Sequence, residues 1–120
     1  MKKSGKKSQN KDYVPDRGDI VWLDLDPSIG REQAKHRPAI VVSPKRFNSL
    51  SSLMFVCPIT SKVKGFSFEV LLTEDMKTKG VVLIHHLRSV DWKARGIKFI
   101  EKAPLSIIEE ISAKLKPLIL

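Results

Sequence analysis

Short apolar runs, separated by clusters of Gly, Pro, Asn, Ser and Asp, constrain the fold of this chain more than any other feature. Runs of this kind predict β-strands joined by turns. Because the strands are short and closely spaced, they favour a small, strongly curved sheet or a partly closed barrel. We expect five or six strands, within residues 20–25, 38–43, 53–60, 66–72, 80–90 and 97–100.

The last part of the chain has a helical pattern instead. Ser106 and Glu109 match a capping box, and Pro117 is expected to end or kink the helix near its last turn. Polar residues occupy one helical face, and the opposite face is apolar, with Ile107, Ile108, Ile111, Leu115 and Leu118. The sequence therefore predicts a mainly β domain with one amphipathic C-terminal helix.

Length and composition fit a single domain. A chain of 120 residues with 42% apolar residues can bury a core without a metal or a disulfide. Cys57 is the only cysteine, which excludes an internal disulfide and fits a reducing compartment. No apolar run is long enough to span a membrane, and no apolar signal segment follows the charged N-terminus. We expect a cytoplasmic protein.

The chain is basic, with a formal net charge of +9. Residues 1–12 hold five lysines and one aspartate and are predicted to form a disordered tail, followed by one domain over residues 13–120. A basic domain with a basic arm favours a polyanionic partner, most often nucleic acid. On charge alone, a basic surface without such a partner fits equally well.

Several kinds of site are missing from the sequence. There is no Gly-rich phosphate loop and no dinucleotide fingerprint. The histidines, His36, His85 and His86, lack the spacing of a metal site. Within one expected strand, His85 and His86 should point to opposite faces and could not share an ion. We expect neither a metal nor another cofactor.

Two segments carry groups that suit metal-free RNA cleavage. In that reaction the 2′-hydroxyl attacks the adjacent phosphorus, and a guanidinium can stabilise the doubly charged phosphorane. A hydroxyl can hold the phosphate oxygens, while other groups accept and donate protons. Arg37, Thr60 and either Glu32 or His36 cover these roles. Neighbouring strands would bring the two segments together.

The order of six short motifs is distinctive. They are Gly-Asp-Ile at 18–20, Asp-Pro at 26–27, Gly-x-Glu-Gln at 30–33, Arg-Pro at 37–38, Pro-Ile-Thr at 58–60 and Gly-Phe at 65–66. Over residues 13–120 the chain closely resembles the MazF/PemK family of toxin endoribonucleases. The resemblance implies an SH3-like small barrel of the CcdB/MazF type, a homodimer, and a cognate antitoxin whose acidic C-terminal segment lies along the RNA groove. It also implies sequence-preferring, metal-independent cleavage of single-stranded mRNA to 2′,3′-cyclic phosphate and 5′-hydroxyl ends.

Carried over by position, the resemblance gives catalytic roles to Arg37, Thr60 and Glu32. His85 stands where many relatives have an aspartate that has been proposed as an acid or base. An imidazole there would shift the relevant pKa from about 4 toward 6.5. Trp22 and Trp92 are expected to be packing residues. The candidate RNA contacts are Ser61, Phe66, His36, Lys64, His85 and Arg88.

Two other functions remain open at this point. One is an RNA-binding barrel that does not cut. The other is a topoisomerase poison that resembles CcdB, whose activity is tied to a C-terminal Trp-Gly-Ile, whereas this chain ends Leu118-Ile119-Leu120. Only the endoribonuclease would leave a cyclic phosphate on its product.

Overall fold

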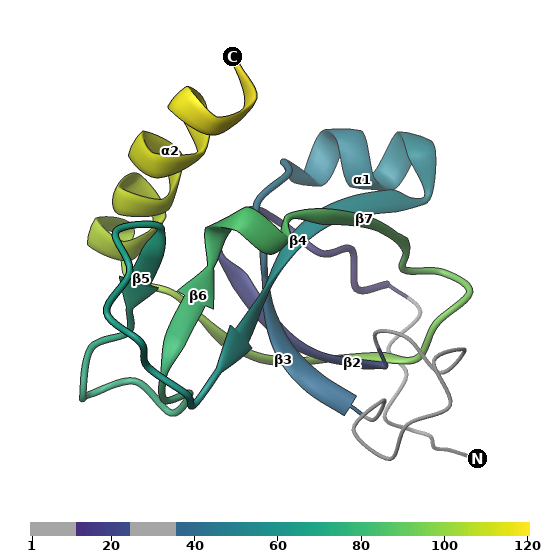
Figure 1. Cartoon of the computed structure of the whole chain (residues 1–120). Helices are drawn as coiled ribbons and strands as arrows, with labels where there is room; N and C mark the ends of the chain where they lie inside the picture. Colours follow the sequence, from purple (N-terminus) through teal and green to yellow (C-terminus); the bar gives the residue numbers. More distant parts are fainter. Residues whose placement is uncertain (1–11, 25–35) are drawn as a thin grey trace, which may run out of the picture.

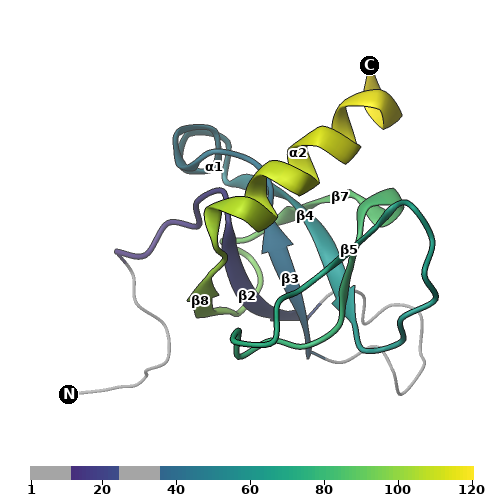
Figure 2. The same ribbon diagram turned by 90° about the vertical axis from the view of Figure 1, so that its left-hand side faces the viewer.

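The structure is a computed structural model, and it describes residues 12–24 and 36–120. A strongly curved antiparallel sheet forms most of the molecule, and a long C-terminal helix lies across one side of it (Figures 1 and 2). The strands are β2 (Asp19–Asp24), β3 (His36–Val41), β4 (Leu53–Thr60), β5 (Glu69–Leu71), β6 (Val81–Leu83), β7 (Arg88–Asp91) and β8 (Ile97–Lys102). The helices are α1 (Lys45–Ser51), the short 3₁₀ helix η2 (Ile84–His86) and α2 (Leu105–Ile119). None of the helices in this part of the chain is long and apolar enough to cross a membrane.

The strands follow the order β5-β6-β4-β3-β2-β8 across the sheet, and β7 pairs with β4 off this path. The first half of β4 pairs with β7 and its last two residues pair with β6, so the sheet bends around β4. The predicted mainly β, barrel-like fold with a C-terminal helix is confirmed, although the sheet is not closed within the described residues. The sheet has seven strands rather than five or six, because the run at 80–90 is divided.

Apolar side chains fill both faces of the curved sheet. Along β2, Ile20 enters a core that is shared with α2, whereas Val21 and Leu23 enter a second core on the other face. This alternation follows from the two-residue period of a strand. Trp92 packs in the second core, as predicted, and its Nε1 donates to the Asn48 carbonyl at 3.0 Å.

The start of α2 differs from its sequence prediction. Pro104, with extended backbone, precedes the first helical residue, and no side chain caps this end. Ser106 already lies in the first turn, so the expected capping box with Glu109 is wrong. The helix also continues past Pro117 to Ile119. Of the predicted apolar face, four residues pack on the core and Leu118 remains 52% exposed.

Helix α1 was not predicted, because its sequence has no apolar stripe. Its anchor is polar. Asn48 is buried; its Nδ2 donates to the Pro15 and Ser43 carbonyls, and its Oδ1 accepts from the Ser43 hydroxyl at 2.6 Å. Such contacts depend on tertiary neighbours, and the period of a sequence cannot reveal them.

The predicted strand at 80–90 is interrupted by η2. The rings of His85 and His86 therefore lie against each other, with centroids 4.3 Å apart, and the expectation that they point to opposite faces is wrong. Within residues 12–24 and 36–120, no group of three or more His, Cys, Asp or Glu could hold a metal ion. The predicted tail lies outside these residues except for Asp12.

Candidate active site

Arg37 and Thr60 line one open groove of about 600 Å³. Arg37 lies at the start of β3, and Thr60 is the last residue of β4. The two strands are antiparallel, with Ala39 opposite Pro58. Continued by two residues, this register places Arg37 across from Thr60. The strand pairing thus brings a guanidinium and a hydroxyl from segments far apart in sequence to the same surface.

The apolar part of the groove includes an exposed tryptophan. Trp22 on β2 lines the groove with Pro38, Ile59 and Ile100, and it is 41% exposed. The prediction that Trp22 is a packing residue is therefore wrong, because its face of β2 opens toward the groove. An exposed indole offers a surface on which a nucleic acid base can stack.

The charged residues that line the groove are all cations. Arg37 is joined there by Lys62, Lys77 and Lys79, and no carboxylate lines the groove among the residues that the structure describes. Lys77 and Lys79 come from the turn between β5 and β6 and were not predicted as site residues. Such a cluster of cations attracts a polyanion.

The Thr60 hydroxyl accepts a hydrogen bond from the backbone N–H of Lys62 at 3.2 Å. A hydroxyl can accept and donate at the same time, so the O–H of Thr60 can still donate toward a ligand. Ser61, the next residue, also lines the groove. The chain end of β4 thus presents two hydroxyls beside the guanidinium.

Other predicted RNA contacts lie in a separate aromatic row. The ring of Phe66 stacks on Phe68 at 4.9 Å, and Phe68 contacts His85 at 4.1 Å between ring centroids. The buried Glu69 carboxylate accepts hydrogen bonds from the backbone N–H groups of Lys64 and Gly65 and so shapes the loop that carries Phe66. None of these residues lines the groove of Arg37.

The remaining candidates are placed less centrally. His36 is the exposed first residue of β3, adjacent to Arg37, but it is not part of the groove lining. Arg88 is exposed at the start of β7, opposite Val56 of β4. Glu32, the predicted base, lies outside the described residues.

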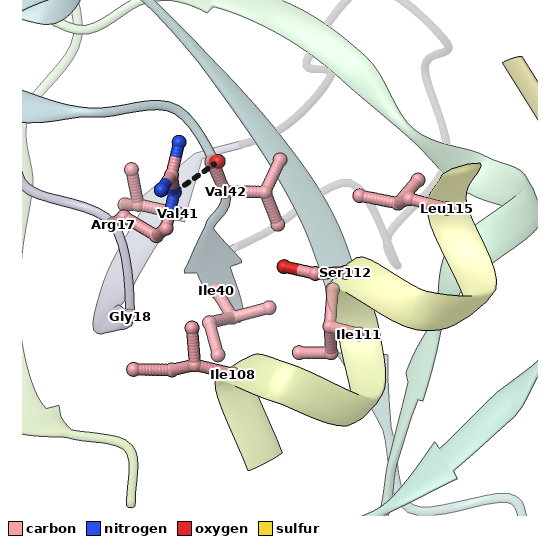
Figure 3. Close-up of a pocket in the computed structure, with 9 residues that line it drawn as sticks. All are labelled: Arg17, Gly18, Ile40, Val41, Val42, Ile108, Ile111, Ser112 and Leu115. Carbon is pink, nitrogen blue, oxygen red and sulfur yellow. Dashed lines mark hydrogen bonds between the residues drawn. The ribbon is translucent and has the colours of Figure 1, made fainter. Parts of the chain in front are cut away.

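A second cavity, between α2 and β3, is mainly a packing gap. Figure 3 shows Ile40, Ile108 and Ile111 around it, and the Nε of Arg17 donates to the Val42 carbonyl at 3.2 Å. The cavity measures about 20 Å³, which is room for roughly one water molecule. It is too small for a substrate.

The environment of His86 predicts its titration. Desolvation by partial burial, and then the neighbouring charges of His85 and Arg88, lower the pKa of His86 below 6.5. We expect NMR titration of its ring protons to give a pKa below 6.5, and His85→Gln to raise it by removing a neighbouring charge. Because folding favours neutral His86, its contribution to the free energy of unfolding is full above pH 6.5. That contribution falls as the pH drops toward the folded-state pKa. A pKa above 6.5 would contradict the prediction.

Comparison with known proteins identifies the family. The model of a family described as "PemK-like, MazF-like toxin of type II toxin-antitoxin system" matches residues 16–119. The chain belongs to this PemK/MazF toxin family. The Endoribonuclease toxin MazF of Escherichia coli K12 is 45% identical over 84 residues, which are 70% of this chain and 75% of that protein. Endoribonuclease PemK of Escherichia coli is 36% identical over 109 residues, covering 87% of this chain and 81% of that protein.

The folds agree as well. A crystal structure of MazE–MazF (Form-II) from Deinococcus radiodurans has a TM-score of 0.82 and 45% sequence identity, and the match covers 89% of this chain and 96% of that chain. The family model and these relatives confirm the sequence-based assignment to the PemK/MazF family. They also show that the chain is an endoribonuclease.

Proposed function

We propose that the chain is a sequence-preferring, metal-independent toxin that cleaves single-stranded mRNA in the groove of Arg37 and Thr60. The observation that carries this proposal is that a guanidinium and a hydroxyl line one open groove whose other charged lining residues are lysines. These are the groups that a transesterification at phosphorus requires.

In the proposed reaction the 2′-oxygen loses its proton to Glu32 and attacks the adjacent phosphorus. Arg37 stabilises the charge of the phosphorane through several N–H donors. The Thr60 O–H donates to a non-bridging oxygen. The bond from phosphorus to the 5′-oxygen then breaks, and that oxygen takes up a proton that Arg37 gives and solvent restores. The products are a 2′,3′-cyclic phosphate and a 5′-hydroxyl.

Further groups are proposed to hold the RNA on either side of the cut. Trp22 offers a ring for stacking inside the groove, which the sequence did not suggest. The candidate contacts Ser61, Phe66, His36, Lys64, His85 and Arg88 are retained as proposals, with Phe66 and His85 in the aromatic row.

A cognate antitoxin is proposed as the protein partner. The similar MazF of Deinococcus radiodurans was crystallised together with MazE, which supports a partner of this kind for the present chain. An acidic antitoxin segment would compete with RNA for the cationic groove. We also propose a homodimer that acts in the cytoplasm.

The test is digestion of a long, defined transcript in the presence of EDTA. We expect discrete fragments whose 5′ ends a kinase labels without phosphatase treatment, and whose 3′ ends carry a cyclic phosphate. Sequencing the 5′ ends gives the cut site. Binding without cutting would favour the non-catalytic barrel, whereas neither binding nor cutting would leave the topoisomerase poison. Loss of cutting in EDTA would contradict the metal-independent mechanism.

A further inference from the structure

The turn between β5 and β6 forms one wall of the groove. Lys77, Thr78 and Lys79 all line it, together with Arg37 and Thr60. The lysines are exposed, whereas Thr78 between them is only 8% exposed. The turn is therefore anchored at its middle residue and presents a cation on each side of the anchor.

Glu101 on β8 is the anchor point. Its Oε2 accepts from the backbone N–H and the hydroxyl of Thr78, both at 2.7 Å, and its Oε1 accepts from the N–H of Lys77 at 3.1 Å. Partial burial alone would raise the pKa of Glu101, but these hydrogen bonds outweigh it and lower the pKa below its usual value. The Glu101 carboxylate is thus charged at neutral pH and accepts three hydrogen bonds from the turn.

This contact joins the two ends of the sheet. In the strand order β5 and β6 lie at one end and β8 lies at the other, so Glu101 reaches across the opening of the curved sheet to the turn. Among the described residues of β8, Glu101 alone accepts hydrogen bonds from the N–H groups of this turn. Glu101 is therefore a positioning residue for Lys77 and Lys79.

The cations of the groove are only partly balanced by the protein, since the charge of Lys77 acts on Glu101 and that of Lys79 on Asp75. The ion pairs between described residues involve Lys102 and Lys114, and neither Arg37 nor the lysines of this turn take part in them. The Nζ of Lys79 donates to the backbone carbonyl of Glu74 in its own turn. Several cations that share one groove repel each other, and a polyanion that binds between them relieves this repulsion.

We propose that Lys77 and Lys79, held by Glu101, form a second phosphate-binding subsite, which takes a backbone phosphate next to the scissile one. The inference rests on the proposed function, since RNA carries a phosphate at every nucleotide. The subsite holds the strand in register and takes no part in the chemical step. Its loss should therefore raise KM and Kd more than it lowers kcat.

The first test compares the double variant Lys77→Ala/Lys79→Ala with Lys45→Ala/Lys93→Ala, which removes two exposed lysines outside the groove. The probe is an RNA oligonucleotide that spans the mapped cut site and carries a 2′-deoxy nucleotide there, so that it binds without being cut. We expect the groove variant to raise Kd about tenfold and to lower the salt slope of binding by about 0.7 for each phosphate that it no longer neutralises. The control should stay near wild type. Equal Kd values and salt slopes for the two variants would overturn the subsite.

The second test asks whether Glu101→Gln tightens or weakens RNA binding. Glu101→Gln removes a negative charge near the groove, so charge alone predicts tighter RNA binding. Loss of the anchor predicts weaker binding, about threefold, and this is the result we expect. Thr78→Val removes one of the hydrogen bonds without changing charge and should weaken binding in the same direction. Tighter binding by Glu101→Gln, or unchanged binding by a folded Thr78→Val, would overturn the positioning role.

These outcomes are separable from those of the proposed function. A wild-type chain that binds the deoxy oligonucleotide but leaves the all-ribose form intact would refute the nuclease while leaving the comparison of Kd values valid. A wild-type chain that cuts, with a groove variant that binds as the control does, would refute the subsite alone.

Discussion

Arg37→Ala is expected to lower the rate of RNA cleavage about 10³-fold while leaving the fold intact. The reason is that the guanidinium is the group in the groove best suited to a doubly charged phosphorane. Arg37 is partly exposed and forms no ion pair among the described residues, so its loss should change the free energy of unfolding by only about 0.5 kcal/mol. Single-turnover cleavage of the mapped oligonucleotide and thermal unfolding give the two measurements.

Three further variants define what the side chain contributes. Arg37→Lys keeps the charge but loses the planar set of donors, so it should recover only part of the rate. Arg46→Ala, which removes an exposed arginine from α1, is the matched control and should cut as wild type does. Thr60→Val removes the proposed donor and should cost about 10²-fold. Cleavage by Arg37→Ala within tenfold of wild type would contradict its assignment to the phosphorane.

The parts of the fold that could be predicted are those that depend on local pattern. Strand β4 spans the predicted residues 53–60, because its apolar run is bounded by turn residues at both ends. The two-residue period of a strand likewise accounts for the alternation along β2, with Ile20 in one core and Val21 and Leu23 in the other. Helix α1 and the start of α2 could not be predicted in this way. The hydrogen bonds of the Asn48 side chain hold α1 in place, and the extended backbone of Pro104 sets where α2 begins.

In the candidate site too, the residues that depend on local pattern could be predicted and those that depend on tertiary contacts could not. Arg37 and Thr60 could be paired from the sequence because both lie at ends of strands that were expected to be neighbours. The place of Lys77 and Lys79 in the groove could not be predicted from the sequence. It depends on a hydrogen bond between Thr78 and Glu101, which are 23 residues apart. Trp22 was missed because its exposure depends on which face of β2 opens to the groove.

Gly80→Ala is the second substitution with a large expected effect, although Gly80 has no side chain to lose. Its φ is +115°, which L side chains rarely adopt. A methyl group there would overlap the Thr60 carbonyl oxygen and lie 2.8 Å from the carbonyl carbon. Because both obstacles are backbone atoms, Thr60 or the turn must move. We expect a loss of about 3 kcal/mol in the free energy of unfolding.

The same displacement of Thr60 should also lower the rate of RNA cleavage. A catalytic group that is moved by about 1 Å can cost roughly 10²-fold in rate. Gly80→Ala should therefore slow cleavage by about that factor under conditions in which denaturant titration shows it to be folded. The effect would come from the position of the Thr60 hydroxyl, since Gly80 itself offers no group to the substrate.

Gly65→Ala is a control that tests the effect of backbone strain without the overlap that a methyl group would make at Gly80. Gly65 also has a positive φ, +80°, but a methyl group there would meet no atom within 4 Å. Its cost should be about 1 kcal/mol, from the backbone conformation alone, with cleavage within about threefold of wild type. Equal losses of stability and rate in the two variants would mean that strain, and not contact with Thr60, explains the effect at Gly80. A larger loss at Gly80 in both measurements would show that this glycine lets the turn of Lys77 and Lys79 rest directly on the end of β4.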